Sequence, residues 1–171
     1  MKKSVVIILA LLLVLTGCAG NIKDGVALLE AKEYEKAKDV FQEDIKEERH
    51  LADAYHGMGI ACFELEEYEE AAEAFESALE QGAEETASIC SFLGACYIET
   101  EVYDQALNAY EKALAKEYIA PELKQEIEFN LIAVYENMGN WDAAKKQMDK
   151  YVENYPDDTR VEKEAEFLET R

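Results

Sequence analysis

Proline and glycine are scarce in this sequence, whose 171 residues include 2 Pro and 8 Gly. These two residues supply most tight turns, so a fold built from many short β-hairpins is excluded. The abundant residues are instead Ala, Glu, Leu and Lys, which favour helices. The composition therefore predicts an all-α protein, and the length is that of one domain.

Basic residues are also few, with 17 Lys and Arg against 38 Asp and Glu and a formal net charge of −21. Such a chain repels the phosphates of nucleic acids and anionic lipid headgroups, which excludes unassisted binding to either. The acidity does not indicate disorder, because hydrophobic residues make up 49% of the chain and aromatic residues 10%. We expect a folded acidic protein with no nucleic-acid partner.

No hydrophobic run is long enough to span a membrane. The main candidate covers residues 5–15 and follows Met1-Lys2-Lys3, whereas a membrane-spanning helix needs about 20 apolar residues. A charged start and a short apolar core are typical of a secretory signal peptide. Leu15-Thr16-Gly17-Cys18 follows directly and resembles the lipobox of bacterial lipoproteins.

The lipobox resemblance implies that residues 1–17 are a signal peptide removed by cleavage between Gly17 and Cys18. Cys18 then becomes the first residue and carries a covalent diacylglycerol and further acyl lipid, and no other cofactor is expected. We expect the protein on the outer face of the cell membrane, or on the outer membrane of a cell that has two. The alternative is an ordinary secretory signal with an incidental cysteine.

Four segments share a pattern that recurs every 34 to 38 residues. In each, an aromatic residue is followed three positions later by Ala and seven positions later by an aromatic residue or Met. The first aromatic residues are Tyr34, Tyr68, Tyr103 and Trp141. Nine positions before them stand Gly25, Gly59, Gly94 and Ile132. This pattern resembles the tetratricopeptide repeat.

The tetratricopeptide resemblance implies an all-α fold, a right-handed α-solenoid of about four helix hairpins. The repeats are expected at residues 18–51, 52–85, 87–120 and 125–158, followed by a C-terminal capping helix at 159–171. The last segment carries a narrow apolar stripe that suits the covering of an open solenoid end, formed by Val161, Ala165 and Leu168.

A glycine within a helix is destabilising by about 1 kcal/mol relative to Ala, so its recurrence needs a packing reason. We expect the two helices of a hairpin to approach closely there, with Gly59 opposite Ala71 and Gly94 opposite Ala106. Tyr68 and Tyr103 are expected to begin the second helices of their hairpins. Ile132 replaces the glycine in the fourth repeat, so we expect that hairpin to be wider.

Three further cysteines lie at mostly apolar positions of the expected first helices: Cys62, Cys90 and Cys96. We expect all three cysteines to act as small hydrophobic side chains buried in the core. A disulfide between Cys62 and Cys96 is one alternative, and a thiol- or metal-dependent enzyme is another.

Catalytic and metal-binding patterns are weak in this chain. Neither His50 nor His56 is placed to act as a base toward a cysteine, and no phosphate-binding loop or nucleophile motif occurs. The acidic segment 64–70 lacks the sharp glycine turn of a cation-binding loop, so a solvated helix end is the favoured interpretation. We expect neither a catalytic nor a metal-binding residue.

The resemblance further implies that the first helices line a concave groove that holds an extended peptide or a partner helix. The side chains expected there are apolar with acidic edges, which predicts a protein or peptide partner with apolar anchors and basic flanks. The alternative for the three phenylalanines is buried packing between repeats. The predicted groove residues are His56, Ile60, Phe63, Glu64, Phe92, Ala95, Ile98, Glu99, Phe129 and Asn130.

These expectations combine into a non-enzymatic protein–protein interaction scaffold, anchored by lipid to the bacterial cell envelope. The carboxylate clamp of chaperone-binding members needs Lys or Arg beside Asn, and apart from Asn130 this groove lacks such residues. Binding of acidic C-terminal tails is therefore not expected. The alternative function is a structural subunit of an envelope assembly machine, for the outer membrane, pili or peptidoglycan synthesis.

Overall fold

The computed structural model describes residues 22–161, 165 and 168. The predicted signal peptide, Cys18 and most of the predicted capping helix lie outside these described residues. Within them the chain forms helices and no strand, and none of the helices is long and apolar enough to cross a membrane. The helices are α1 (Ile22–Glu30), α2 (Tyr34–Lys46), α3 (Leu51–Glu64), α4 (Tyr68–Glu80), α5 (Ala87–Glu99), α6 (Tyr103–Leu114), α7 (Pro121–Asn137) and α8 (Trp141–Asn154).

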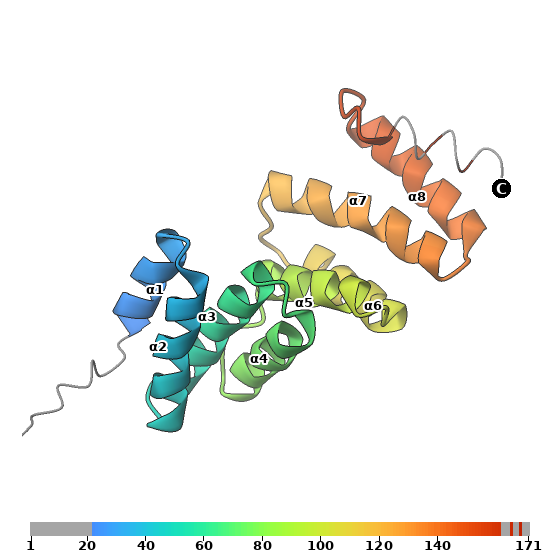
Figure 1. Cartoon of the computed structure of the whole chain (residues 1–171). Coiled ribbons are helices and arrows are strands. Elements are labelled where there is room, and N and C mark those ends of the chain that lie inside the picture. The colour runs from blue at the N-terminus through green and yellow to red at the C-terminus, as the bar shows by residue number, and fades with distance from the viewer. Residues whose placement is uncertain (1–21, 162–164, 166–167, 169–171) are drawn as a thin grey trace, which may run out of the picture.

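Consecutive helices pair into four hairpins, α1–α2, α3–α4, α5–α6 and α7–α8, which follow one another along the molecule (Figure 1). The predicted starts of two second helices, at Tyr68 and Tyr103, are confirmed, and the other two begin at the equivalent Tyr34 and Trp141. The all-α solenoid of helix hairpins predicted from the repeat pattern is therefore confirmed.

The first helices of the hairpins form the inner side of the solenoid. α1 packs against α3 and α5 against α7, whereas within the described part no two second helices pack closely together. The second helices α2, α4 and α6 each pack instead on the first helix of the next hairpin. Helices inside a curved stack are closer together than those outside, so α3, α5 and α7 present the concave face.

The hairpin turns contain one residue with a left-handed backbone. Lys32, Glu66 and Glu101 have φ of 59°, 62° and 61°, two positions before the aromatic residue that begins the second helix. In the fourth hairpin Gly139 takes this position, with a φ of 70°. Glycine adopts this conformation without steric penalty, so the first three turns are strained and the fourth is not.

Aromatic rings fill the space that the recurrent glycines leave. A Cβ on Gly59 would lie 2.8 Å from Cδ1 of Phe75, and a Cβ on Gly94 would lie 2.6 Å from Cε1 of Tyr110. Both rings come from the second helix of the same hairpin, one turn beyond the expected contact. The predicted partners are therefore wrong, because the long rings reach the glycines ahead of the two alanines, Ala71 and Ala106.

Phe41 joins the first two hairpins by the same device. Its ring lies against Gly25 of α1 and Gly57 of α3, where added Cβ atoms would approach it to 2.5 Å and 2.3 Å. Gly57 was not singled out from the sequence, because it lies outside the repeating position. One ring therefore fixes the spacing of three helices, α1, α2 and α3.

The fourth hairpin is packed differently. Ile132 stands where the other repeats have glycine, and it packs in a buried cluster with Ala144, Met148 and Tyr151. α7 and α8 still pack on each other like the helices of the other hairpins, and the wider spacing expected from Ile132 stays a prediction.

The described residues of the predicted capping segment cover this cluster. Val161, Ala165 and Leu168 are helical, and Val161 and Leu168 are buried in the cluster that contains Met148. The apolar stripe predicted for the cap therefore faces the end of the solenoid.

Candidate functional site

A hollow of about 250 Å³ opens on the concave face between α3, α5 and α7. We call it the concave hollow. It brings together four of the predicted groove residues and adds two serines from α5 and two residues from the first turns of α7. Its lining is formed by Phe63, Ser88, Ser91, Phe92, Ala95, Leu123, Glu126 and Asn130.

The two phenylalanines of the hollow connect it to the core. The rings of Phe63 and Phe92 meet edge to face, with centroids 5.1 Å apart and an interplanar angle of 73°. Phe92 also stacks on the buried ring of Phe75, at 5.2 Å and 15°. Both phenylalanines are half-buried, so each contributes to packing between repeats and to the wall of the hollow.

Three other predicted groove residues lie on the concave helices but outside this lining. The His56 ring lies 6.0 Å from that of Phe75. Burial lowers the pKa of His56, and nearby Asp53 opposes this only in part. Ile60 and Ile98 are half-buried against the core clusters of the second and third hairpins. These side chains mainly support the fold.

The two predicted edge carboxylates are exposed at the ends of α3 and α5. A hydrogen bond with Glu64 raises the pKa of Tyr34, and burial together with the charge of Glu99 raises that of Tyr68. Each glutamate thus lies beside the tyrosine that begins the second helix of the preceding hairpin. The edge of the concave face is therefore acidic, although neither glutamate enters the hollow.

Leu123 and Glu126 are lining residues that the sequence analysis missed. α7 has 17 residues, against 14 in α3 and 13 in α5, and its additional turn carries Leu123. Pro121 at the start of the helix was the available signal for this extension. Glu126 occupies the repeat position of Ser88, so alignment of the repeats could have found it.

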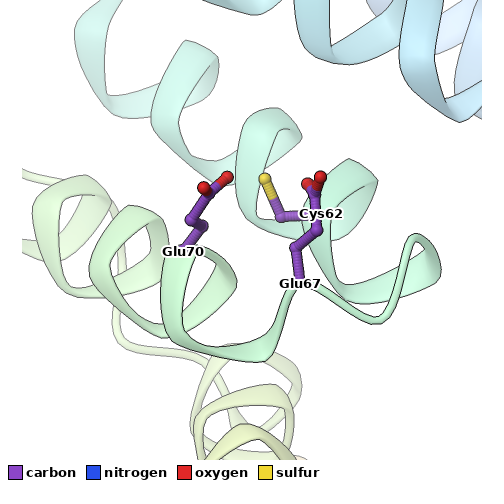
Figure 2. Close-up of side chains that lie close together, drawn as sticks. All are labelled: Cys62, Glu67 and Glu70. Atoms are coloured by element: carbon purple, nitrogen blue, oxygen red, sulfur yellow. The ribbon is translucent and has the colours of Figure 1, made fainter.

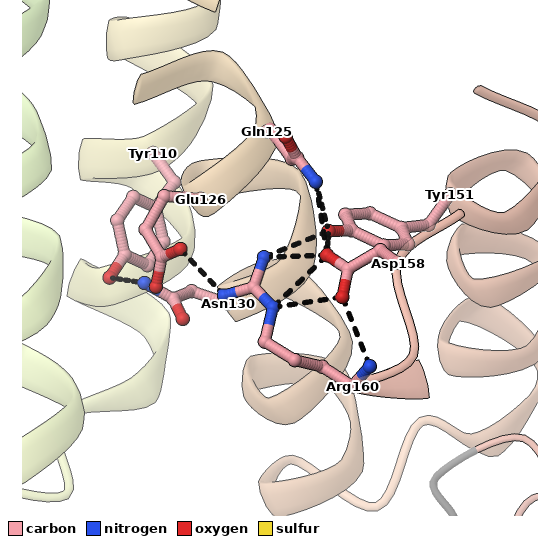
Figure 3. A network of polar contacts seen from close by, with 7 residues as sticks. All are labelled: Tyr110, Gln125, Glu126, Asn130, Tyr151, Asp158 and Arg160. Carbon is pink, nitrogen blue, oxygen red and sulfur yellow. Dashed lines mark hydrogen bonds and ion pairs between the residues drawn. The ribbon is translucent and has the colours of Figure 1, made fainter. Parts of the chain in front are cut away.

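The fourth-repeat end of the predicted groove is covered by the chain itself. The Phe129 ring lies 5.6 Å from the ring of Tyr151, and Cζ of Arg160 lies 4.5 Å from its centroid. Figure 3 shows Arg160 reaching back toward α7, where its Nη1 lies 2.8 Å from Oε2 of Glu126. Phe129 therefore does not line an open groove in this conformation.

Asn130 is also engaged within the protein. Its Nδ2 donates a hydrogen bond of 3.2 Å to the hydroxyl of Tyr110, whose pKa is raised by burial. The lining of the concave hollow contains no Lys or Arg. The geometry thus agrees with the expectation that the groove lacks a carboxylate clamp.

A group of metal-ligand type lies at the second hairpin, where Cys62, Glu67 and Glu70 approach one another (Figure 2). Nζ of Lys38 lies 2.5 Å from a carboxylate oxygen of both Glu67 and Glu70. Partial burial lowers the pKa of Lys38, but these two bonds raise it to a value well above the usual range. The ammonium group already pairs with both carboxylates and joins the first hairpin to the second.

The cysteines behave as core residues. Cys62, Cys90 and Cys96 are buried and free, so the alternative of a Cys62–Cys96 disulfide is not found. Burial raises the pKa of Cys62 to about 11 and that of Cys96 to about 12, which keeps both thiols protonated at neutral pH. A protonated buried thiol is a poor nucleophile.

A second hollow, of about 470 Å³, lies on the opposite side, between the second helices α4 and α6. Its floor includes Cys90, Leu93 and Tyr97 of α5. Polar side chains from α6, among them Asn108 and Lys112, line its wall. We call it the convex hollow, and it is the competing location for a partner.

The comparisons with known proteins agree with the helix hairpins. Tetratricopeptide-repeat models match residues 97–163 and 52–82. No curated protein matches the sequence. Among solved structures, YrrB, described as a tetratricopeptide protein with an unusual peptide-binding site, is 27% identical, with a TM-score of 0.68 over 79% of this chain and 67% of its own.

Structures of MamA are also similar in fold. One, a double mutant of MamA from RS-1, is 20% identical with a TM-score of 0.74 over 87% of this chain and 81% of its own. Another is 23% identical with a TM-score of 0.65 over 82% and 74%. The matched repeats, the hairpin geometry and these structural likenesses agree, and the chain belongs to the tetratricopeptide-repeat family.

Proposed function

We propose that this protein is a lipid-anchored interaction scaffold that binds an extended peptide segment of a partner protein in its concave hollow. The observation that carries the proposal is the hollow itself, where apolar surface from three successive first helices meets at one place. Tetratricopeptide proteins serve in general as protein-interaction modules, and the similar protein YrrB is described as having a peptide-binding site.

The side chains of the hollow favour an apolar anchor. Phe63, Phe92 and Leu123 provide apolar surface, and Ser88 and Ser91 provide hydroxyl groups for a peptide backbone. Burial of apolar surface contributes about 25 cal/mol per Å², less the cost of ordering the peptide. A single half-open hollow of this size therefore supports moderate affinity and one or two anchor side chains.

The charges around the hollow favour basic flanks. Exposed glutamates end α3 and α5, and the whole chain has a net charge of −21. A field of this sign accelerates the approach of basic segments and excludes acidic competitors, mainly through the association rate. We accordingly expect binding to weaken as the salt concentration rises.

The anchor is part of the proposal. The resemblance to a lipobox supports a lipid at Cys18, a few residues before α1, and such an anchor would hold the first hairpin close to the membrane surface. Cys18→Ser removes the thiol that receives the diacylglyceryl group and should give an unprocessed, unlipidated chain. Membrane fractionation with intact-mass measurement tests this, and normal acylation of the variant would contradict the anchor.

Selection of a displayed random-peptide library on the full-length protein tests the groove. Wild-type protein should enrich peptides with apolar anchors and Lys or Arg flanks, and Phe63→Ala/Phe92→Ala should lose this enrichment. Ser91→Arg fills the hollow without removing a core ring and should have the same effect. Tyr118→Ala removes a ring that is 84% exposed and lies outside the hollow, and it should leave selection unchanged.

Circular dichroism must show that each variant remains folded, because Phe92 also packs on Phe75. Equal enrichment by folded wild-type protein and by the two hollow variants would place the interface elsewhere. The convex hollow would then be the next location to test.

A further inference from the structure

Arg160 lies against the fourth-repeat end of the groove. It follows α8 in sequence, yet its guanidinium lies over the ring of Phe129 on α7. Its Nη1 bonds Glu126 at 2.8 Å, and its Nη2 lies 3.0 Å from the hydroxyl of Tyr151 (Figure 3). An aromatic face combined with a carboxylate is the surface that a planar guanidinium prefers.

This guanidinium position is continuous with the concave hollow. Glu126 and Asn130 line the hollow together with Phe63 and Phe92, and Glu126 is the residue that Arg160 binds. A peptide that places an apolar anchor between the phenylalanines can therefore reach Glu126 with its next side chains.

The ion pair between Arg160 and Glu126 is exposed enough to be exchanged. Its side chain is 43% exposed and that of Glu126 is 50% exposed, and ion pairs with this exposure contribute at most about 1 kcal/mol. Asp158, two residues away, also pairs with Arg160 and remains available when Glu126 is lost. When a peptide arginine replaces Arg160 at Glu126, Arg160 therefore keeps Asp158 as its counterion and no buried charge is left unpaired.

The turn that carries Arg160 is fixed by other contacts. Asp158 Oδ2 accepts hydrogen bonds from the hydroxyl of Tyr151 at 2.5 Å and from Nε2 of Gln125 at 3.0 Å. These bonds tie the segment to both α7 and α8 without the guanidinium. The contact of Arg160 with Glu126 and Phe129 is thus additional to what the cap needs.

We propose that Glu126 and Phe129 form an arginine-binding subsite, which Arg160 occupies in the free protein and an arginine of the bound peptide takes over. The proposal rests on the proposed function and names the residue that its basic flank presents. Arginine is specified over lysine because a planar guanidinium can stack on Phe129 and bond Glu126 together, whereas an ammonium group cannot stack.

Peptide selection on three variants of the full-length protein tests the subsite. Arg160→Gln removes the internal competitor and should raise the enrichment of arginine next to the apolar anchor. Arg160→Gln/Glu126→Gln also removes the carboxylate and should lose that enrichment while it retains the apolar anchor. Leu168→Ala loosens the cap without touching Arg160, and its arginine enrichment should equal that of wild type.

The affinity of individual selected peptides measures how strongly Arg160 competes with a peptide arginine. An arginine peptide should bind Arg160→Gln roughly two- to fivefold more tightly than wild type, the change that a half-exposed ion pair supports. Its citrulline analogue, which is uncharged, should bind both proteins equally.

The outcomes separate the two proposals. Enrichment of apolar anchors with the same arginine frequency on all variants would overturn the subsite and leave the proposed function standing. The subsite would also be overturned if Leu168→Ala raised arginine enrichment as Arg160→Gln does, because a loosened cap would then be the cause. No enrichment of any peptide on folded wild-type protein would overturn both.

Discussion

The middle hairpins and the last hairpin solve the same packing problem in different ways. Between α3 and α4, and between α5 and α6, an aromatic ring packs against a glycine, and the surrounding core is made of Ala, Cys and other apolar side chains. Between α7 and α8, Ile132 replaces the glycine, and a buried carboxylate, Glu128, receives bonds from α7 and α8.

The polar contacts of the last hairpin are numerous. Oε1 of Glu128 lies 2.8 Å from Nζ of Lys124 and 3.0 Å from that of Lys150, and its Oε2 accepts a hydrogen bond of 2.8 Å from Tyr155. The Asp158–Arg160 pair adds a second group. These ion pairs join α7, α8 and the segment after α8, in addition to the apolar cluster of this hairpin.

The difference teaches that the repeat pattern specifies helix spacing, while stability at the end of the solenoid depends on charge. The middle hairpins should respond to changes of shape and the last one to changes of protonation and salt.

The largest effect should come from Phe75→Ala, which deletes the ring that packs on Gly59 and Phe92. A buried Phe-to-Ala change leaves a cavity and lowers the free energy of unfolding by about 3–5 kcal/mol. Urea unfolding followed by circular dichroism measures it, with Glu73→Ala, at an exposed position of the same helix, as a near-neutral control. A decrease in the free energy of unfolding below about 1 kcal/mol would show that the Phe75 ring is not a main source of the stability of this hairpin.

Gly94→Ala should be the next most damaging, because its Cβ would overlap Tyr110. Overpacking of this kind costs about 1–3 kcal/mol, although Ala is otherwise the better helix former. Gly94→Ala/Tyr110→Leu should recover part of the loss by making room. A stabilising Gly94→Ala would contradict the glycine–ring contact.

Acidification should loosen the last hairpin first. Burial raises the pKa of Glu128, but its bonds to Lys124, Lys150 and Tyr155 outweigh this and lower it. The bonds from Arg160 hold the pKa of Asp158 well below its usual range. A carboxylate with a depressed folded-state pKa adds stability above its unfolded pKa of about 4, and that stability is lost as the pH falls toward the folded value.

Trp141, the single Trp of the sequence, begins α8 and reports on this hairpin. Its fluorescence should change at a higher pH than the far-ultraviolet circular dichroism of the whole chain. The wild-type protein should lose free energy of unfolding below pH 4, by on the order of 1–3 kcal/mol for hydrogen bonds to a charged group. Glu128→Gln, which cannot be protonated there, should show a smaller loss. Coincident transitions for both signals would contradict a separately acid-sensitive end.

The smallest effect should be a gain. Glu66→Gly and Glu101→Gly place glycine where φ is near +60°, as Gly139 does in the last hairpin. Glycine removes the steric strain of the folded turn but increases the conformational entropy of the unfolded chain. The net effect should stabilise each variant by about 0.5–1 kcal/mol. Gly139→Ala serves as the reverse test and should destabilise. A rise in the melting temperature of Gly139→Ala would invalidate the comparison of the turns.

Most of the fold could be predicted from the sequence because the repeat pattern is local and strong. The starts of the second helices at Tyr68 and Tyr103 follow from the position of one aromatic residue per repeat. The contact of Gly59 could not be assigned correctly, because the choice between Ala71 and Phe75 depends on how far a side chain reaches across the hairpin. That distance is a property of three-dimensional packing, not of spacing along the chain.

The candidate site was less accessible to prediction. Phe63 and Phe92 could be predicted because both lie on the inner face of the first helices, although they occupy different positions of the repeat. The covering of Phe129 could not be predicted, because Arg160 lies far from it in sequence and returns through a turn after α8. Leu123 was missed because the repeat pattern contains no information about the additional turn of α7.

Site-specific photocrosslinking tests the concave hollow most directly. The photoreactive residue p-benzoylphenylalanine is placed in the full-length protein at Ala95, which lines the concave hollow, or at Asn108, which lines the convex hollow. In native membranes, a defined adduct to a partner protein should form at Ala95 and be lost when Ser91→Arg is added, with none at Asn108. Adduct formation at Asn108 alone would contradict a partner-binding concave groove.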